Sequence, residues 1–194
     1  RVMDATGKYV LCDCTGYRLD GTDTEPNMYV GIIINRSLAD TTDSVTGLGD
    51  VHALVNAIGE MRHVPHEAGF IAIKVDDIAE VNARFGFDAG DRVLAESAAC
   101  LMDCSRGKGR LFRSTGPMFV ALFDELGPEA IDELADEIER FLGSPVLIGS
   151  LEYQPPIRVA TLHLDAVDRQ PVSILNELKA RLKEAPQVPG TKLD

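Results

Sequence analysis

Cysteine and histidine are the side chains that most readily bind transition metals or take part in redox chemistry. The chain has four of each, and its cysteines form two close pairs, Cys12 with Cys14 and Cys100 with Cys104. Their C-x-C and C-x3-C spacings differ from the C-x2-C knuckles of zinc sites. We therefore expect reduced structural thiols. The histidines have no acidic or thiol partner in the sequence pattern, so no metal site is assigned to them.

Three polar stretches carry a more specific pattern. They are Asp43-Ser-Val-Thr-Gly-Leu-Gly-Asp50, then Lys74-Val-Asp-Asp-Ile-Ala-Glu-Val-Asn82 continuing to Phe85-Gly86 and Gly90-Asp91, and finally Arg113-Ser-Thr-Gly-Pro-Met-Phe119. In order, they resemble D-x-L-T-G-L-x-N-R, D-x-D-x-F-K-x-I-N-D-x-x-G-H-x-x-G-D and R-Y-G-G-D-E-F. These are motifs of the GGDEF family, whose active members are diguanylate cyclases.

Hydrophobic periodicity predicts the elements that must position these stretches. Helices are expected at 51–61, 76–85, 88–101, 128–142 and 174–182, and strands at 70–75, 110–113, 118–123, 146–148 and 157–164. This mixed order with an internal β-hairpin indicates an α+β fold. The family resemblance adds a nucleotidyl-cyclase-like, mostly antiparallel central sheet flanked by helices. Strand 70–75 should lie at its centre, beside the hairpin 110–123.

The sequence of the first 40 residues predicts a structural unit separate from the rest of the chain. Strands are expected at 8–14 and 28–34, joined by a long polar connection into an N-terminal β-hairpin. The phrase Gly31-Ile-Ile-Ile34, followed by a polar connector, resembles the end of a PAS sensor domain, which GGDEF proteins often carry. We therefore expect a hairpin and connector over 1–40, a PAS remnant by this resemblance, and a GGDEF-like domain over 41–194.

The resemblance also shows what is missing from the expected catalytic site. The first Asp of D-x-D, a metal ligand in the family, falls on Lys74, which offers donors and no acceptor. The acidic pair of the signature falls on Pro117 and Met118, and its first glycine falls on Thr115, so only Gly116 remains. We therefore expect no catalytic residue, metal or cofactor. Magnesium would be needed only if the chain were an active cyclase.

Other family positions are kept. Those that contact guanine fall on Asn82 and Asp91, and the alternative is that both side chains cap helices. The family's inhibitory site, R-x-x-D, keeps Arg106 and loses its Asp, and Arg113 matches the arginine before the signature. Both arginines are interpreted as solvated loop charges. GTP binding is expected to be absent or no tighter than about millimolar.

Charge and hydropathy limit the partners. The net charge of -12 disfavours nonspecific binding to nucleic acid or to an anionic membrane. The longest apolar run, Tyr29 to Ile34, is too short to span a bilayer. Because the sequence starts with Arg1, we expect a cytoplasmic fragment of a longer protein, with any membrane anchor outside it.

These expectations leave three functions open. The first is a catalytically inactive GGDEF-like domain of a bacterial signalling protein, acting in homodimerisation, signal relay or regulation of a partner domain. The second is a diguanylate cyclase that makes cyclic di-GMP from GTP. The third is a noncatalytic sensor of GTP or cyclic di-GMP.

Overall fold

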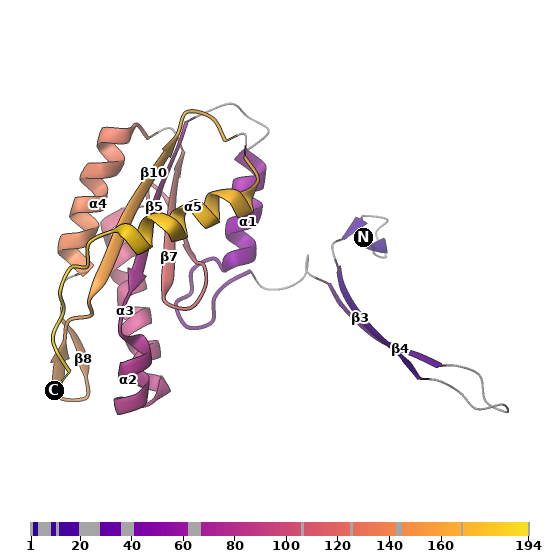
Figure 1. The fold of residues 1–194 in the computed structure, drawn as a ribbon, viewed down its shortest axis with the longest axis horizontal. Coiled ribbons are helices and arrows are strands. Elements are labelled where there is room, and N and C mark those ends of the chain that lie inside the picture. Colours follow the sequence, from indigo (N-terminus) through magenta and orange to yellow (C-terminus); the bar gives the residue numbers. More distant parts are fainter. Residues whose placement is uncertain are drawn as a thin grey trace. The chain divides into compact units, whose positions relative to one another are not determined.

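The chain divides into two compact units, Arg1–Asp40 and Thr41–Asp194 (Figure 1). The computed structural model describes residues 2–3, 9–10, 12–19, 28–35, 41–61, 67–105, 107–124, 126–142, 145–167 and 169–193. In the part of the chain so described, no helix has both the length and the apolar character needed to cross a bilayer.

The described residues of the smaller unit form paired strands. β1 (Val2–Met3) pairs antiparallel with β2 (Tyr9–Val10), and β3 (Cys12–Leu19) pairs antiparallel with β4 (Met28–Asn35). The expected pairing is present, but the prediction that its first strand ends at residue 14 is wrong. Thr15 and Tyr17 are residue types that favour extended backbone, so the strand continues to Leu19.

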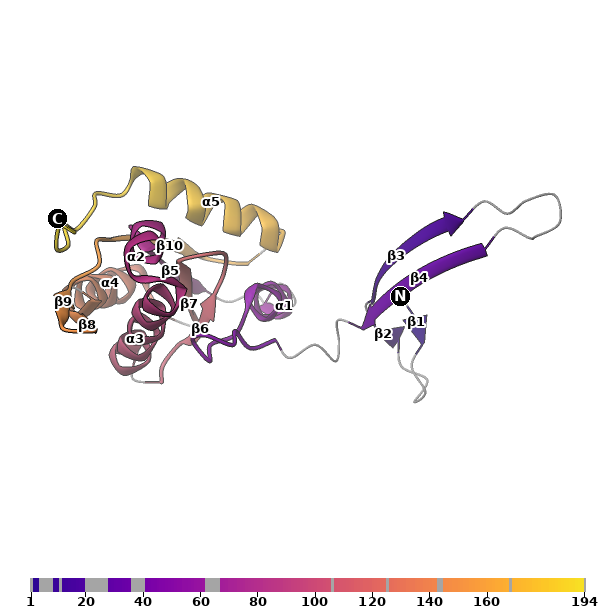
Figure 2. The same cartoon turned by 90° about the horizontal axis from the view of Figure 1, so that it is seen from below.

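The larger unit is a sheet with helices on both faces (Figures 1 and 2). Its described elements are, in order, α1 (Val51–Met61), β5 (Ala68–Val75), α2 (Ile78–Phe85), α3 (Phe87–Ser105), β6 (Arg110–Arg113), β7 (Met118–Asp124), α4 (Pro128–Leu142), β8 (Val146–Ile148), β9 (Leu151–Tyr153), β10 (Ile157–Leu164) and α5 (Pro171–Glu184).

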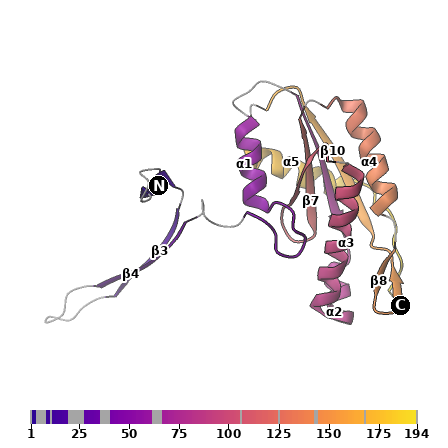
Figure 3. The ribbon, with the colours of Figure 1, turned by 180° about the vertical axis from the view of Figure 1, so that it is seen from behind.

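The central sheet has the strand order β10-β5-β7-β6, and every pairing in it is antiparallel. Because side chains alternate along a strand, Phe70 and Ala72 of β5 pack with α1 and α5, whereas Ile71 and Ile73 pack with α3 and α4. Figure 3 shows the face with α3 and α4. The α+β class and the central position of strand 70–75 are confirmed.

The segment before α1 returns along the edge strand β6. The amide of Asp50 donates to the Thr41 carbonyl (2.6 Å), which closes a short loop. The amide of Arg113 then donates to the Gly49 carbonyl (2.7 Å), and a Cβ on Gly49 would lie 2.7 Å from the Phe112 ring. A side chain at residue 49 would therefore separate this segment from β6.

One strand pair of the larger unit was not expected. β8 and β9 form an antiparallel pair, with Gly149 between them at φ 63°. The sequence analysis expected only the strand 146–148 between α4 and β10. The residue that anchors the additional strand is Tyr153, which is fully buried in the core. An aromatic ring of this size stabilises even a three-residue strand.

Candidate functional site

The strand register brings two of the motif stretches together. Lys74, near the end of β5, lies opposite Met118, the first residue of β7. The amide of Val75 donates to the Pro117 carbonyl (3.0 Å), and Gly116 supplies the left-handed conformation of the turn, φ 58°. The turn therefore lies beside the end of β5, as the family resemblance predicts.

Lys74 takes part in a network centred on Asp76. The Asp76 carboxylate is only 8% exposed and forms an ion pair with the Lys74 ammonium. It also accepts from Arg158 Nε (3.0 Å) and from Gln187 Nε2 (2.7 Å), while Arg158 Nη1 donates to the Ala185 carbonyl (2.7 Å). Burial would raise the pKa of Asp76, but the hydrogen bonds from Lys74, Gln187 and Arg158 outweigh it and lower the pKa below 3.8. The carboxylate is thus ionised and fully engaged.

The remaining signature positions, Thr115, Pro117 and Met118, carry uncharged side chains. Met118 is 5% exposed and belongs to the core cluster on the α1 and α5 face. Pro117 has no amide hydrogen to donate. Thr115 accepts the Met118 amide through its carbonyl at 3.2 Å. The tip of the hairpin therefore presents no carboxylate.

A cavity of about 550 Å³ opens beside this tip. Its basic lining residues are Lys74, Arg158, Lys179 and Lys183, and the rest of its lining is Thr115, Pro117, Met118 and Leu182. The sequence analysis did not identify Arg158, Lys179 or Lys183. The available signal was the spacing of Lys179 and Lys183, which places two like charges on one face of a helix.

The two guanine-contact candidates lie inside helices. Asn82 is in α2, which starts at Ile78, and Asp91 is in α3, which starts at Phe87. The interpretation of these side chains as helix caps is therefore wrong, because each helix starts four residues earlier. Asp91 is exposed. Asn82 lines a second cavity of about 540 Å³ that also contains Lys74 and acidic residues of the β5–α2 connection.

Asn82 packs tightly against Gly90. A Cβ on Gly90 would lie 2.0 Å from Asn82 Oδ1, and this oxygen is buried without a hydrogen-bond partner in the described residues. Buried amide groups normally find partners. The close approach of α3 to α2 thus accounts for the glycine at residue 90.

The contact between Asn82 and Gly90 can be tested by a double-mutant cycle. Gly90→Ala is expected to lower the free energy of unfolding by about 1–3 kcal/mol, because the new methyl group displaces the amide. Asn82→Ala should relieve that clash, so that the double variant regains at least half of the loss. Urea unfolding of the four proteins measures the coupling. Additive losses would contradict the packing described here.

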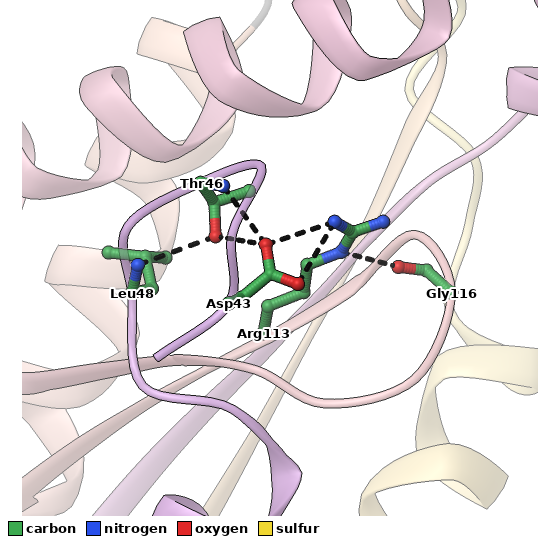
Figure 4. A network of polar contacts seen from close by, with 5 residues as sticks. All are labelled: Asp43, Thr46, Leu48, Arg113 and Gly116. Atoms are coloured by element: carbon green, nitrogen blue, oxygen red, sulfur yellow. Dashed lines mark hydrogen bonds and ion pairs between the residues drawn. The ribbon is translucent and has the colours of Figure 1, made fainter. Parts of the chain in front are cut away.

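Arg113 is a structural residue (Figure 4). Its guanidinium donates to both carboxylate oxygens of Asp43, at 3.0 and 3.2 Å, and its Nε donates to the Gly116 carbonyl at 3.0 Å. Thr46 donates its amide and its hydroxyl to the same carboxylate, at 2.9 and 2.7 Å. Because the Arg113 side chain is 15% exposed, its interpretation as a solvated charge is wrong. Arg106 lies outside the described residues.

The cysteine prediction is confirmed where the structure describes the side chains. Cys100 and Cys104 lie on α3 as thiols, with no disulfide between them. Burial, together with the neighbouring Cys104, raises the pKa of Cys100 to about 12. The thiol is therefore protonated at neutral pH and is a poor nucleophile. Cys12 and Cys14 have side chains outside the described part.

Comparisons with known proteins agree with this geometry. Residues 40–187 match the family model described as "Diguanylate cyclase, GGDEF domain". Over 113 residues the chain is 29% identical to the cyclic di-GMP phosphodiesterase PdeR of Escherichia coli (strain K12), a match that covers 57% of the chain and 17% of PdeR. The chain thus spans less than a fifth of that relative's length.

Two crystal structures from Pseudomonas aeruginosa share the fold. Diguanylate cyclase SiaD, in complex with its activator SiaC, superposes with a TM-score of 0.70 and 20% identity, over 76% of this chain and 58% of that one. The FimX GGDEF domain superposes with a TM-score of 0.68 and 17% identity, over 76% of this chain and 94% of that one.

Proposed function

This chain belongs to the diguanylate cyclase GGDEF domain family, and from that premise we propose that it is a catalytically inactive member. In this proposal it serves a bacterial signalling protein by dimerising, by relaying the state of a neighbouring sensor or by regulating a partner domain. The observation that carries the proposal is the environment of Lys74. Its ammonium stands where the family resemblance expects a metal-ligating carboxylate, and it forms an ion pair with the buried Asp76.

The side chains at this position do not fit a divalent cation. Magnesium prefers several oxygen ligands, mainly carboxylates and water. Here Asp76 is engaged by Lys74, Arg158 and Gln187, and Met118 is a buried thioether. Among the residues that the structure describes, no three acidic, histidine or cysteine side chains are placed to hold a metal ion. A phosphoryl transfer that depends on metal charge is therefore unsupported at this turn.

The noncatalytic role draws on the comparisons. SiaD is a diguanylate cyclase that was crystallised in complex with its activator SiaC, and the part of PdeR that matches this chain is 17% of that protein. We propose by analogy that the present domain communicates with other domains or subunits. The PAS origin of the first 40 residues and a cytoplasmic setting belong to the same proposal.

The proposal is tested by GTP turnover. The purified chain, incubated with GTP and magnesium or manganese, should form cyclic di-GMP no faster than a buffer blank. The expected deficit relative to an active GGDEF domain assayed in parallel is at least about a thousandfold, because the charge stabilisation of the transferring phosphoryl group is missing. Turnover that a chelator abolishes would overturn the proposal and favour the cyclase alternative.

A further inference from the structure

We propose that a groove between α3 and α4 binds a basic amphipathic helix of a partner protein. The two helices lie on the same face of the sheet (Figure 3). A cavity of about 490 Å³ lies between them and the start of β8. The described residues that line it include the carboxylates of Glu96, Asp103 and Glu137 and no basic side chain. This lining disfavours an anionic ligand and favours a cationic one.

The wall of the groove that α3 forms has uncharged residues between two carboxylates. The spacing i, i+3, i+4, i+7 places on one face of the helix the residues Glu96, Ala99, Cys100 and Asp103. Burial raises the pKa of the Cys100 thiol to about 12, so this side chain is uncharged at neutral pH. Seven residues rise by about 10 Å along a helix. A partner helix with basic side chains seven residues apart would therefore match both carboxylates.

The floor of the groove and its opposite wall are mostly apolar. Cys104 and Leu142 are buried, and the Ser97 hydroxyl already donates to a backbone carbonyl of its own helix (2.8 Å). On α4, Phe141 lies one turn after Glu137 and is 50% exposed at the groove. Phenylalanine is enriched in protein interfaces, and an exposed ring beside a cavity offers a partner apolar surface to cover.

The charge of this face disfavours other occupants. Against one basic residue, Arg140, α4 carries six acidic residues, Glu129, Asp132, Glu133, Asp136, Glu137 and Glu139. Two copies of this face would repel each other, and the face would also repel a nucleic acid or an anionic membrane. A small polyamine would pair with the carboxylates but leave the apolar surface uncovered. A helix with an apolar face flanked by lysine or arginine satisfies both features.

The inference rests on the proposed contact with other domains or subunits, to which it assigns a surface. The groove is separate from the signature turn, since none of the residues that line it lines either cavity that contains Lys74. A partner in this groove would therefore contact the domain without contacting that turn.

Fluorescence anisotropy with a labelled synthetic helix tests the inference. The probe is a peptide of about 18 residues of leucine, alanine and lysine, with an apolar face flanked by lysines seven residues apart. Titration with the full chain at low salt should give a Kd of about 10–100 µM that weakens as the salt concentration rises. A peptide of the same composition, in an order that forms no apolar face, should bind at least about tenfold more weakly.

Two charge variants locate the binding site. Glu96→Gln with Asp103→Asn should weaken binding at least about fivefold, because two ion pairs with the peptide are lost. The matched control, Glu129→Gln with Asp136→Asn, makes the same charge change on α4 outside the groove and should stay within about twofold. Thermal melts should show that both variants are folded.

Two apolar variants test the other half of the match. Phe141→Ala should weaken binding at least about fivefold, because the ring is the largest exposed apolar side chain at the groove. Val172→Ala removes an exposed apolar side chain from α5 and should change the affinity by less than about twofold.

Several outcomes would overturn the inference. Equal losses in the groove charge variant and its control would mean that the peptide responds only to net charge. Displacement of the probe by spermine at the concentration needed of unlabelled peptide would mean that apolar contacts contribute nothing. A wild-type chain that sediments as a dimer, with Phe141→Ala as a monomer, would mean that a second copy occupies the groove.

The inference and the inactive-domain proposal fail differently. If the peptide does not bind, the inference is overturned and the proposed loss of catalysis stands. If the chain turns over GTP in a chelator-sensitive way and still binds the peptide in the groove, the loss of catalysis is overturned and the inference stands.

Discussion

Returning the three family carboxylates, by Lys74→Asp, Pro117→Asp and Met118→Glu together, is expected to destabilise the domain by about 4–6 kcal/mol and to restore weak GTP turnover at most. Most of the loss comes from Met118, which is 5% exposed and packs in the core, so that a glutamate there would bury an unpaired charge. Lys74 is 45% exposed, and its removal contributes only about 1 kcal/mol.

The same substitutions place two carboxylates close together. An aspartate at residue 74 would lie beside Asp76, which keeps Arg158 and Gln187 as partners. Repulsion between the two should raise the pKa of one of them and deepen the loss of stability near neutral pH. Thr115 and the helix α5 would be unchanged, so the rebuilt site would still lack other family features.

Urea unfolding with and without millimolar magnesium measures this prediction. The matched control is Lys74→Gln, Pro117→Ala and Met118→Leu, which alters the same positions without adding carboxylates and should cost no more than about 2 kcal/mol. If magnesium restored the triple carboxylate variant to wild-type stability, the prediction would be contradicted. That result would mean that the three carboxylates were all that the metal site lacked.

Asp43→Ala is expected to lower the free energy of unfolding by about 3 kcal/mol. The substitution removes two charge-assisted hydrogen bonds from Arg113 and two hydrogen bonds from Thr46. The Arg113 side chain is only 15% exposed, and the substitution removes the counterion of its guanidinium. For a domain of this size, the loss corresponds to a fall in Tm of about 6–12 °C.

The stabilisation from Asp43 should depend on pH in one direction. Burial would raise the pKa of Asp43, but the hydrogen bonds from Thr46 and Arg113 outweigh it, so the folded pKa lies below 3.8. A group whose pKa is lower in the folded state stabilises the fold above its unfolded pKa. The difference between wild type and Asp43→Ala should therefore be constant above about pH 5 and shrink as the pH falls through the folded pKa.

The matched control for this prediction is Asp50→Ala. Asp50 accepts from the amides of His52 and Ala53, at 2.8 and 2.9 Å, and its removal should cost only about 1 kcal/mol. Equal losses for the two variants would mean that the pair with Arg113 contributes little. A loss at Asp43 that persists unchanged in acid would mean that its carboxylate charge is not the source.

Motif spacing correctly predicted which residues form the signature turn, because a turn and its flanking strands are determined mainly by residues that are close in the sequence. Lys74 and Met118 could be expected to meet once the hairpin and the strand 70–75 were assigned to one sheet. The contacts of Arg113 with Asp43 and of Asp76 with Arg158 join residues 70 and 82 positions apart. Such pairs depend on how the helices and strands pack against each other, and the hydrophobic periodicity of the sequence does not predict them.

The positions of helix ends are a second feature that the sequence predicted poorly. Asn82 and Asp91 carry side chains that suit caps, but α2 follows Asp77, whose left-handed conformation, φ 61°, the sequence does not signal. A cap is defined by backbone geometry, and residue type is only a weak guide to it. The basic lining of the cavity beside the signature turn was not predicted for a related reason. Lys179 and Lys183 can be assigned to it only when the fold places them near Lys74 and Arg158.

The pairing of Gly49 with β6 also determines how a mechanical load enters the larger unit. Tension on the backbone at Thr41 first strains the short loop closed by Asp50, and then the hydrogen bond from the Arg113 amide to Gly49. Arg113 in turn holds the Gly116 carbonyl through its guanidinium. The force path from the start of this unit therefore runs along one edge strand to the tip of the signature hairpin.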